Sequence, residues 1–335
     1  MPPFTDLAEL AATRVGGKAL FANDEFFAPK ENLLRPGRGE FIPGKFTSRG
    51  KWMDGWETRR RRTPGHDWCV IQLGMPGVVR GVDVDTHHFI GNFPERCSLE
   101  ACFRPGASSK AALLGPKTTW VEILPPKHLQ GGSQNLFPVA NDRPWTHLLL
   151  NIYPDGGVAR LRAYGEVALD WPALALSKRP FDLASIRSGG LVLGASDMHF
   201  GSKDNLIMPG RSLNMGDGWE TRRRRGPGHD WLILRFGGPG TIDRLEIDTN
   251  HFKGNYPESA SLEGCVTRET GLEMLSGEAP GWREVLPRTK LRPHHRHVYS
   301  REVRDVGPFT HVRFRIFPDG GVSRLRIHGR AAPAE

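Results

Sequence analysis

Asp54 to Trp68 read DGWETRRRRTPGHDW, and the same block returns at Asp217 to Trp231 as DGWETRRRRGPGHDW, a constant 163 positions later (217 − 54). A repeat retained only for packing keeps its apolar pattern and lets its charges drift. Here the Asp, Glu, Arg and His residues are kept letter by letter. We therefore expect this block to carry the chemistry of the protein.

The duplication continues outward from the block. DTHHFIGNFPE at 85–95 matches DTNHFKGNYPE at 248–258, and YPDGGVARLRAYG at 153–165 matches FPDGGVSRLRIHG at 317–329. The starts of the copies match more loosely, because the first carries about ten extra residues around Phe41 to Lys51. These matches predict two tandem domains of ordinary size, residues 1–170 and 171–335, with a Pro-containing linker beginning at Trp171.

Short alternating runs bounded by Gly and Pro predict an all-β fold, with each copy a jelly-roll sandwich. In DWCVIQLG, Asp67, Cys69, Ile71 and Leu73 share the face expected to meet the core. An ionised Asp67 there would be costly unless paired, so we expect an arginine partner. PDGG predicts a hairpin between LLLNIY and VARLRAY.

Composition limits the class of protein. The formal net charge is +9, which suits nucleic acid, a membrane surface or a small anion as partner. No run of 18 apolar residues occurs, and Asp6 and Glu9 stand where a signal peptide would need a basic and then apolar run, so we expect no signal peptide, no membrane partner and a cytoplasmic protein. The four cysteines show no CxxC spacing and are expected to be buried, reduced thiols.

The four consecutive arginines are the first candidate for binding. Asp54, Glu57, His66 and Asp67 enclose them, and a nucleic-acid surface would not normally interleave carboxylates that repel phosphate. We therefore expect internal ion pairs, with one or two arginines free to clamp a carboxylate. If the run is extended, Glu57, Arg59 and Arg61 share one face; this makes these arginines, and Arg222 and Arg224 in the second copy, the preferred clamp.

Two loops supply candidates for acid or base chemistry. His88 persists as His251, whereas its neighbour His87 becomes Asn250, so His88 is the better candidate of the two, with a hydrogen-bonded structural histidine as the open alternative. Glu95, in the GNFPE loop with Asn92, is open to the role of acid, base or salt-bridge partner. The HHRH run at 294–297 allows metal ligation, but exposed loop is the more frequent meaning of such clusters. We expect no metal and no cofactor.

The doubled DGWETRRRR with PGHDW, DTHHF or DTNHF with GNFPE or GNYPE, and PDGG with RLR together resemble the allantoicase family over nearly the whole chain. The resemblance implies two allantoicase repeats, each a jelly roll similar to galactose-binding domains, in a homo-oligomer. It also implies hydrolysis of allantoate to ureidoglycolate and urea, a step of purine degradation.

Allantoate carries one carboxylate and two ureido groups, so its hydrolysis needs a guanidinium clamp, polar groups for the ureido N–H donors and an acid for the departing urea. The residues expected to meet these needs fall into two groups. The catalytic candidates are His88, His251, Glu57, Asp54 and Glu95; the substrate-binding candidates are Arg59, Arg61, His66, Asn92, Arg160, Arg222 and Arg224. A non-catalytic carbohydrate- or anion-binding jelly roll and a nucleic-acid-binding protein are the alternatives, and a urea-release assay separates all three.

Overall fold

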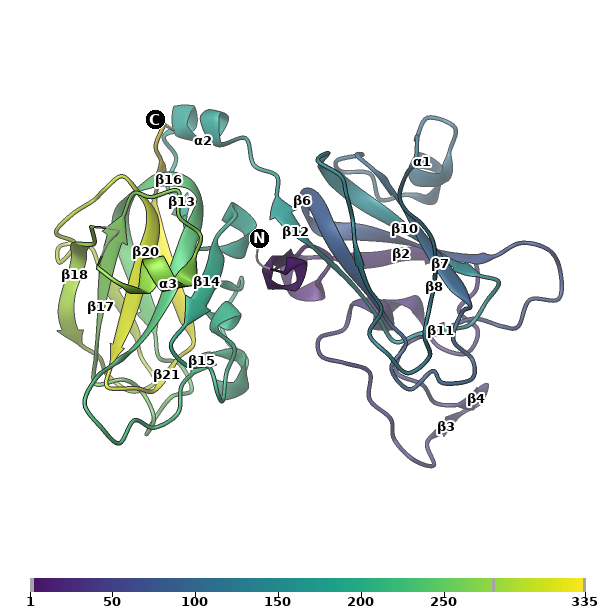
Figure 1. The fold of residues 1–335 in the computed structure, drawn as a ribbon, viewed down its shortest axis with the longest axis horizontal. Helices are drawn as coiled ribbons and strands as arrows, with labels where there is room; N and C mark the ends of the chain where they lie inside the picture. The colour runs from purple at the N-terminus through teal and green to yellow at the C-terminus, as the bar shows by residue number, and fades with distance from the viewer. Residues whose placement is uncertain (1–2, 279–280, 334–335) are drawn as a thin grey trace. The chain divides into compact units, whose positions relative to one another are not determined.

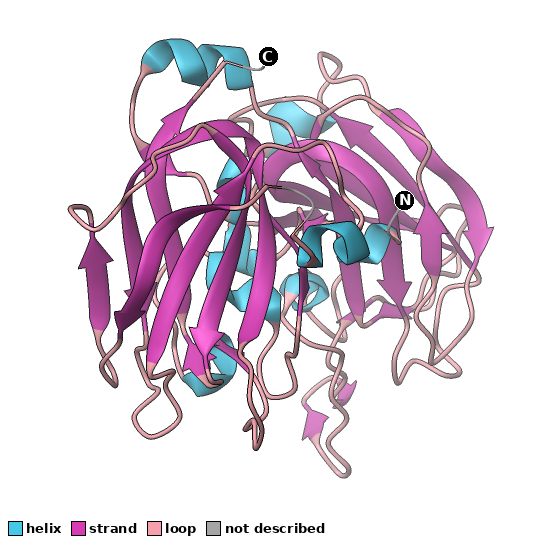
Figure 2. Cartoon of the chain, turned by 60° about the vertical axis from the view of Figure 1, so that its left-hand side comes forward, coloured by secondary structure: helices cyan, strands magenta, loops and turns pink. Residues whose placement is uncertain are grey.

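The computed structural model describes residues 3–278 and 281–333 of the chain. Two compact units, Met1–Ala168 and Leu169–Glu335, divide it two residues before the boundary expected from the sequence. Strands are the main regular secondary structure of each unit, and the helices are short (Figures 1 and 2). The fold is all-β, as predicted.

In the first unit every strand pairing is antiparallel. Its strands are β1 (Ala8–Glu9), β2 (Lys18–Ala22), β3 (Phe46–Thr47), β4 (Gly50–Lys51), β5 (Trp56–Glu57), β6 (Asp67–Asp85), β7 (Arg96–Cys102), β8 (Val121–His128), β9 (Leu136–Pro138), β10 (Trp145–Tyr153), β11 (Gly157–Val158) and β12 (Arg160–Val167). Its helices are η1 (Phe4–Asp6), η2 (Thr13–Val15), η3 (Lys30–Leu34) and α1 (Lys110–Leu114).

The second unit repeats this arrangement, without a counterpart of the β3–β4 hairpin among the residues described there. Its strands are β13 (Phe181–Asp182), β14 (Leu191–Ala195), β15 (Trp219–Glu220), β16 (Asp230–Asp248), β17 (Ser259–Cys265), β18 (Arg283–Lys290), β19 (Arg296–Tyr299), β20 (Phe309–Phe317), β21 (Gly321–Val322) and β22 (Arg324–Ala331). Its helices are α2 (Trp171–Ser177), η4 (Ile186–Ser188), η5 (Lys203–Ile207), η6 (Met215–Asp217) and α3 (Leu272–Ser276).

One long strand joins the two layers of each sandwich. The first half of β6 pairs with β2 and β10, whereas its second half pairs with β9 and β12. The strand changes layer around Gly74 and Gly77, where a Cβ atom would lie 2.6 Å from the carbonyl oxygens of Val15 and Glu166 respectively. Glycine is required at these positions because the backbones approach too closely for a side chain.

The predicted core face of β6 is confirmed. Asp67, Cys69, Ile71 and Leu73 are all buried, and so are their counterparts in β16. Asp67 accepts a hydrogen bond of 2.8 Å from Arg61, which is the arginine partner that burial of its carboxylate demanded. The four cysteines are also buried, free thiols.

Two local predictions are wrong. β10 and β12 do not form a hairpin, because β10 pairs with the first half of β6 and β12 with the second; the PDGG segment therefore crosses between the layers. The expected linker instead begins with helix α2. Asp170 caps this helix, and the indole N–H of the buried Trp171 donates to the carbonyl of Pro239, which anchors the helix to the second unit.

No helix among the described residues is long and apolar enough to cross a membrane.

Candidate functional site

A short strand pair positions one glutamate in each unit. β5 pairs with β11, so Glu57 lies opposite Gly157, and β15 pairs with β21 in the same way. Trp56 is fully buried beside Glu57, and its indole N–H donates to the carbonyl of Asp24. The alternation of a strand then directs Glu57 away from the side that Trp56 fills.

The amide of an asparagine from the GNFPE or GNYPE loop holds this glutamate. Asn92 Nδ2 donates to Glu57 Oε1 at 2.7 Å, and Asn255 makes the same contact with Glu220. Burial raises the pKa of Glu57, and the hydrogen bond from Asn92 only partly opposes that shift. We call Glu57–Asn92 and Glu220–Asn255 the Glu–Asn pairs; a carboxyl group with a raised pKa is suited to donating a proton.

In the second unit the Glu–Asn pair borders a pocket of about 780 Å³, within the size range of small-molecule sites. We call it the Glu–Asn pocket. It is lined by Phe200, Glu220, Thr221, Arg223, Arg224, Gly254, Asn255, Tyr256, Glu258, Lys290, Leu291, Pro318, Asp319 and Gly320.

The arginine run does not alternate as an extended strand, because β5 ends at Glu57. The backbone N–H of Arg61 donates a hydrogen bond of 2.7 Å to the Asp155 carboxylate, and this contact changes the direction of the chain after Glu57. The side chain of Arg59 pairs with Asp24 at 2.6 Å, while that of Arg61 pairs with Asp67. Both preferred clamp arginines are thus already matched to carboxylates.

The second copy repeats these pairings. Arg222 pairs with Asp197 at 3.2 Å and Arg224 with Asp230 at 2.5 Å. Asp24 and Asp197 were missed as arginine partners, although an aspartate at the corresponding place in both copies was a signal that could have revealed them.

Arg223, which lies between Arg222 and Arg224 in the sequence, was also missed. Arg223 is exposed and lines the Glu–Asn pocket, and it forms no ion pair with any residue that the structure describes. Its counterpart in the first unit is Arg60. Strand alternation had placed this arginine on the face opposite Glu57, so the error followed from assuming an extended run.

His251 is not among the residues that line the Glu–Asn pocket of the second unit, and His88 is its counterpart in the first unit. His88 and His251 share a left-handed backbone, with φ of 67° and 71°. The ring of His88 lies 3.9 Å from that of His87 and 5.7 Å from that of Phe41. His251 Nε2 lies 3.0 Å from the carbonyl oxygen of Ser212. Their acid or base role stays a prediction.

The remaining loop candidates lie at the surface or in structural contacts. Glu95 is exposed and lies 3.6 Å from Arg96. Glu258, its counterpart, lines the Glu–Asn pocket, and hydrogen bonds from Ser259 and then Arg288 lower its pKa. His66 Nε2 lies 3.1 Å from Asn151 Oδ1, which fixes its ring.

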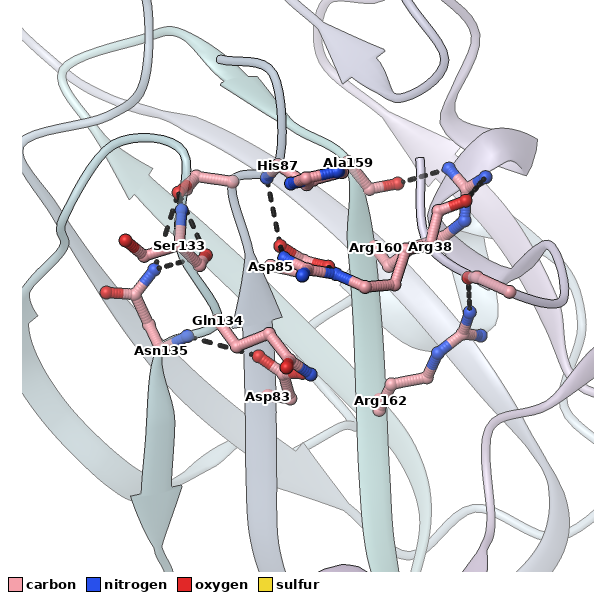
Figure 3. A network of polar contacts seen from close by, with 12 residues as sticks. Arg38, Asp83, Asp85, His87, Ser133, Gln134, Asn135, Ala159, Arg160 and Arg162 are labelled. Carbon is pink, nitrogen blue, oxygen red and sulfur yellow. Dashed lines mark hydrogen bonds and ion pairs between the residues drawn. The ribbon is translucent and has the colours of Figure 1, made fainter. Parts of the chain in front are cut away.

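Arg160 belongs to a second polar cluster, shown in Figure 3 with Arg38 and Asp85, and Asp54 is its ion-pair partner. Arg160 Nη2 donates to Asp54 Oδ2 at 2.5 Å, and only 3% and 5% of the two side chains are exposed. Burial alone would raise the pKa of Asp54, but hydrogen bonds from Arg160 and the Glu40 amide outweigh it and lower that pKa. Arg38 binds both oxygens of Asp85 nearby.

No group of three or more His, Cys, Asp or Glu side chains is arranged to hold a metal within residues 3–278 and 281–333. In the HHRH run, His297 is buried, with Nδ1 3.0 Å from the carbonyl oxygen of Ile247 and Nε2 accepting from the Arg292 amide. The HHRH run is therefore held in part by the contacts of His297 with the backbone of its own unit.

Comparison with known proteins gives a consistent result. The family model "Allantoicase repeat" matches residues 8–168 and 181–332. The chain is 50% identical over 329 residues to "Probable allantoicase 1" of Burkholderia mallei, covering 98% of this chain and 96% of that protein. It is 49% identical over 327 residues to "Probable allantoicase" of Pseudomonas aeruginosa, with 98% and 97% coverage. The crystal structure of allantoicase from Saccharomyces cerevisiae superposes with a TM-score of 0.81 at 34% identity, over 96% of this chain and 92% of that one.

Proposed function

This chain belongs to the allantoicase family, and on that premise we propose that it hydrolyses allantoate to ureidoglycolate and urea at its Glu–Asn pairs. The observation that carries this assignment is the repeated geometry. In both units a half-buried glutamate, which lies within the most strictly duplicated stretch of sequence, accepts a hydrogen bond from the amide of an asparagine in the GNFPE or GNYPE loop.

The groups around the pair fit the chemistry of a ureido acid. The amide oxygen of Asn255 is an acceptor for a ureido N–H. Arg223, which has no carboxylate partner among the described residues, supplies a guanidinium for the substrate carboxylate. Lys290 lines the same pocket and adds positive charge. Arg60 and Asn92 would act correspondingly in the first unit.

The glutamate serves as acid and then as base. Protonated Glu57 donates its proton to the ureido nitrogen that leaves, and the C–N bond breaks to release urea. The lone pair of the remaining ureido nitrogen stabilises the imine-like carbon. Water then adds to that carbon and returns a proton to the Glu57 carboxylate, which forms ureidoglycolate and restores the acid. Raising the pKa of Glu57 by burial favours the protonated starting form.

The test is urea release from allantoate by the full chain and by the double variant Glu57→Gln/Glu220→Gln. We expect the wild type to release urea and the double variant to lose about 10²- to 10⁴-fold in rate, the contribution typical of general acid–base catalysis. Wild-type rates in a folded double variant would overturn the site. Failure of the wild type to release urea would favour the non-catalytic binding protein instead.

Three further properties are proposed with this function. The first is a cytoplasmic location, because all four cysteines are free thiols and the cytoplasm is a reducing compartment. We also propose a homo-oligomer, tested by light scattering, and a reaction that needs no metal. Urea release that disappears after exhaustive chelation and returns with a divalent ion would overturn the last of these.

A further inference from the structure

We propose that the first repeat contains a second binding site, separate from its Glu–Asn pair, that takes a small carboxylate anion. The site is a cavity of about 320 Å³, which we call the arginine pocket. Its charged lining consists of Arg35, Arg38, Glu40, Lys45, Asp54 and Arg160.

The extra residues of the first repeat build one wall of this pocket. Ile42 and Lys45 line it from the insertion, and Trp52 lines it directly after the β3–β4 hairpin. The ammonium group of Lys45 lies 3.8 Å from the centre of the Trp52 ring, and the Trp52 amide donates to the Lys45 carbonyl. These contacts hold the Lys45 ammonium group against the wall of the pocket. A loop extension with no role in binding would not need to position a cation there.

The base of the pocket is rigid. The Arg160–Asp54 pair is almost fully buried, and Arg160 also donates to the backbone carbonyls of Asp54 and Ala159. Asp54 additionally accepts from Arg35 at 3.1 Å. One carboxylate thus compensates two guanidinium groups, and the side chain of Arg35 remains half exposed at the opening.

Charge balance separates this pocket from its counterpart in the second repeat. Four cations, namely Arg35, Arg38, Lys45 and Arg160, face three carboxylates, those of Glu40, Asp54 and Asp85. Within the described residues Lys45 has no acidic partner.

The counterpart is a cavity of about 220 Å³ that no insertion covers. Each of its four arginines has a carboxylate partner; the pairs are Arg211–Asp248, Arg296–Glu246, Arg324–Asp217 and Arg326–Asp182, and Glu246 is shared with Arg244. Among the described residues, Lys45 is therefore the cation that sets the first pocket apart, because it comes from the insertion and has no counterpart in the second repeat.

The ligand class follows from size and charge. The volume is at the lower end of the range of small-molecule sites, about 300 to 1,000 Å³. An excess of one cation matches a monoanion, and guanidinium groups match the two oxygens of a carboxylate. The apolar sides of Pro36, Ile42 and Trp52 leave room for a small organic body rather than a bare ion.

The arginine pocket is distinct from the proposed reaction site. None of its lining residues corresponds to a residue that lines the Glu–Asn pocket. Asp54 and Glu57 come from one segment, but Met53, Phe89 and Ala159 form an apolar cluster beside it. The inference therefore does not depend on where urea is released.

The experiment uses the full chain labelled with 5-fluorotryptophan, in which the Trp52 resonance is assigned by Trp52→Phe. The probe is hydantoate, a carboxylate with one ureido group. We expect a saturable shift of the Trp52 fluorine signal. Lys45→Met should weaken the apparent Kd at least tenfold, and so should replacing residues 40–51 with the Leu-Asn that occupies 213–214. The matched control, Arg211→Met in the second repeat, should leave the Kd unchanged.

Three outcomes would overturn the proposal: no Trp52 shift, an equal shift in Lys45→Met, or tighter binding of inorganic phosphate than of hydantoate. The same titration in Glu57→Gln/Glu220→Gln should be unaffected. Failure of the arginine-pocket proposal is therefore distinguishable from failure of the proposed reaction site, which the urea-release assay tests.

Discussion

The two repeats share one framework and differ in what surrounds it. Equivalent partners bind the framework side chains in both repeats, as the contacts of Arg59, Arg61 and Glu57 match those of Arg222, Arg224 and Glu220. Around this framework the loops have diverged. The first repeat has the β3–β4 hairpin, and His87 is replaced by Asn250 in the second.

The difference separates two kinds of constraint. The duplicated letters maintain buried or partly buried ion pairs, whose partners must change together because a lone buried charge is costly. The loops have no such requirement and can give each repeat a different ligand preference. We therefore expect substitutions in the framework to affect both repeats alike, and substitutions in the loops to affect one repeat only.

The largest expected effect separates the two repeats as catalysts. Glu57→Gln and Glu220→Gln each remove the acid of one Glu–Asn pair, and because the loops around the two pairs differ, we expect the two variants to lower urea release by unequal amounts. The measurement is the rate at saturating allantoate for each single variant. Equal losses would mean that the differences between the loops of the two repeats do not affect the rate of urea release.

A large effect on stability is expected from breaking a framework pair. Arg160→Met leaves the Asp54 carboxylate buried without its closest partner, and we expect a loss of about 3 to 5 kcal/mol in the free energy of unfolding. Arg324→Met is the matched variant in the second repeat. Urea denaturation followed by tryptophan fluorescence measures both, and a loss below 1 kcal/mol in each, roughly that of a surface pair, would contradict the role given to these pairs.

A smaller effect is expected from the asparagine of each Glu–Asn pair. Asn92→Ala and Asn255→Ala remove one hydrogen bond to a carboxyl group, worth about 1.5 to 3 kcal/mol, so turnover should fall about tenfold or somewhat more. Asn→Asp variants serve as controls of similar size. If the alanine variants keep full activity, the asparagines do not orient the acid.

The smallest effect is a change in pH dependence. The folded pKa of Glu57 lies above its usual value of 4.5, so Glu57 loses its proton as pH rises through that raised pKa, and acid catalysis falls with it. In Glu220→Gln, where only the first repeat should react, kcat should decline on the alkaline side of that pKa. A kcat without this decline would show that protonated Glu57 is not required.

The sequence was sufficient for the repeat, the all-β class and the core face of β6, because each depends on a local pattern. The Arg61–Asp67 pair was predictable for an energetic reason, since burial of Asp67 required a cation. The choice of Arg59 as clamp depended on backbone direction after Glu57. Asp155, almost a hundred residues away, sets that direction through its bond to the Arg61 amide.

The arginine pocket was beyond sequence reasoning for a similar cause. Its cations come from the loop after η3, the insertion and the start of β12, and their register in space is set by the fold. The PDGG segment misled for a related reason. Its residues favour a tight turn, but pairing with the two halves of β6 takes the flanking strands into different layers.

The central claim is that the Glu–Asn pairs bind the substrate, and the most direct measurement is a crystal structure of Glu57→Gln/Glu220→Gln soaked with allantoate. We predict a ureido group within hydrogen-bond distance of Asn92 and Asn255, and the carboxylate at Arg60 and Arg223. Allantoate bound instead beside His88 or His251, with both Glu–Asn pairs empty, would contradict the account.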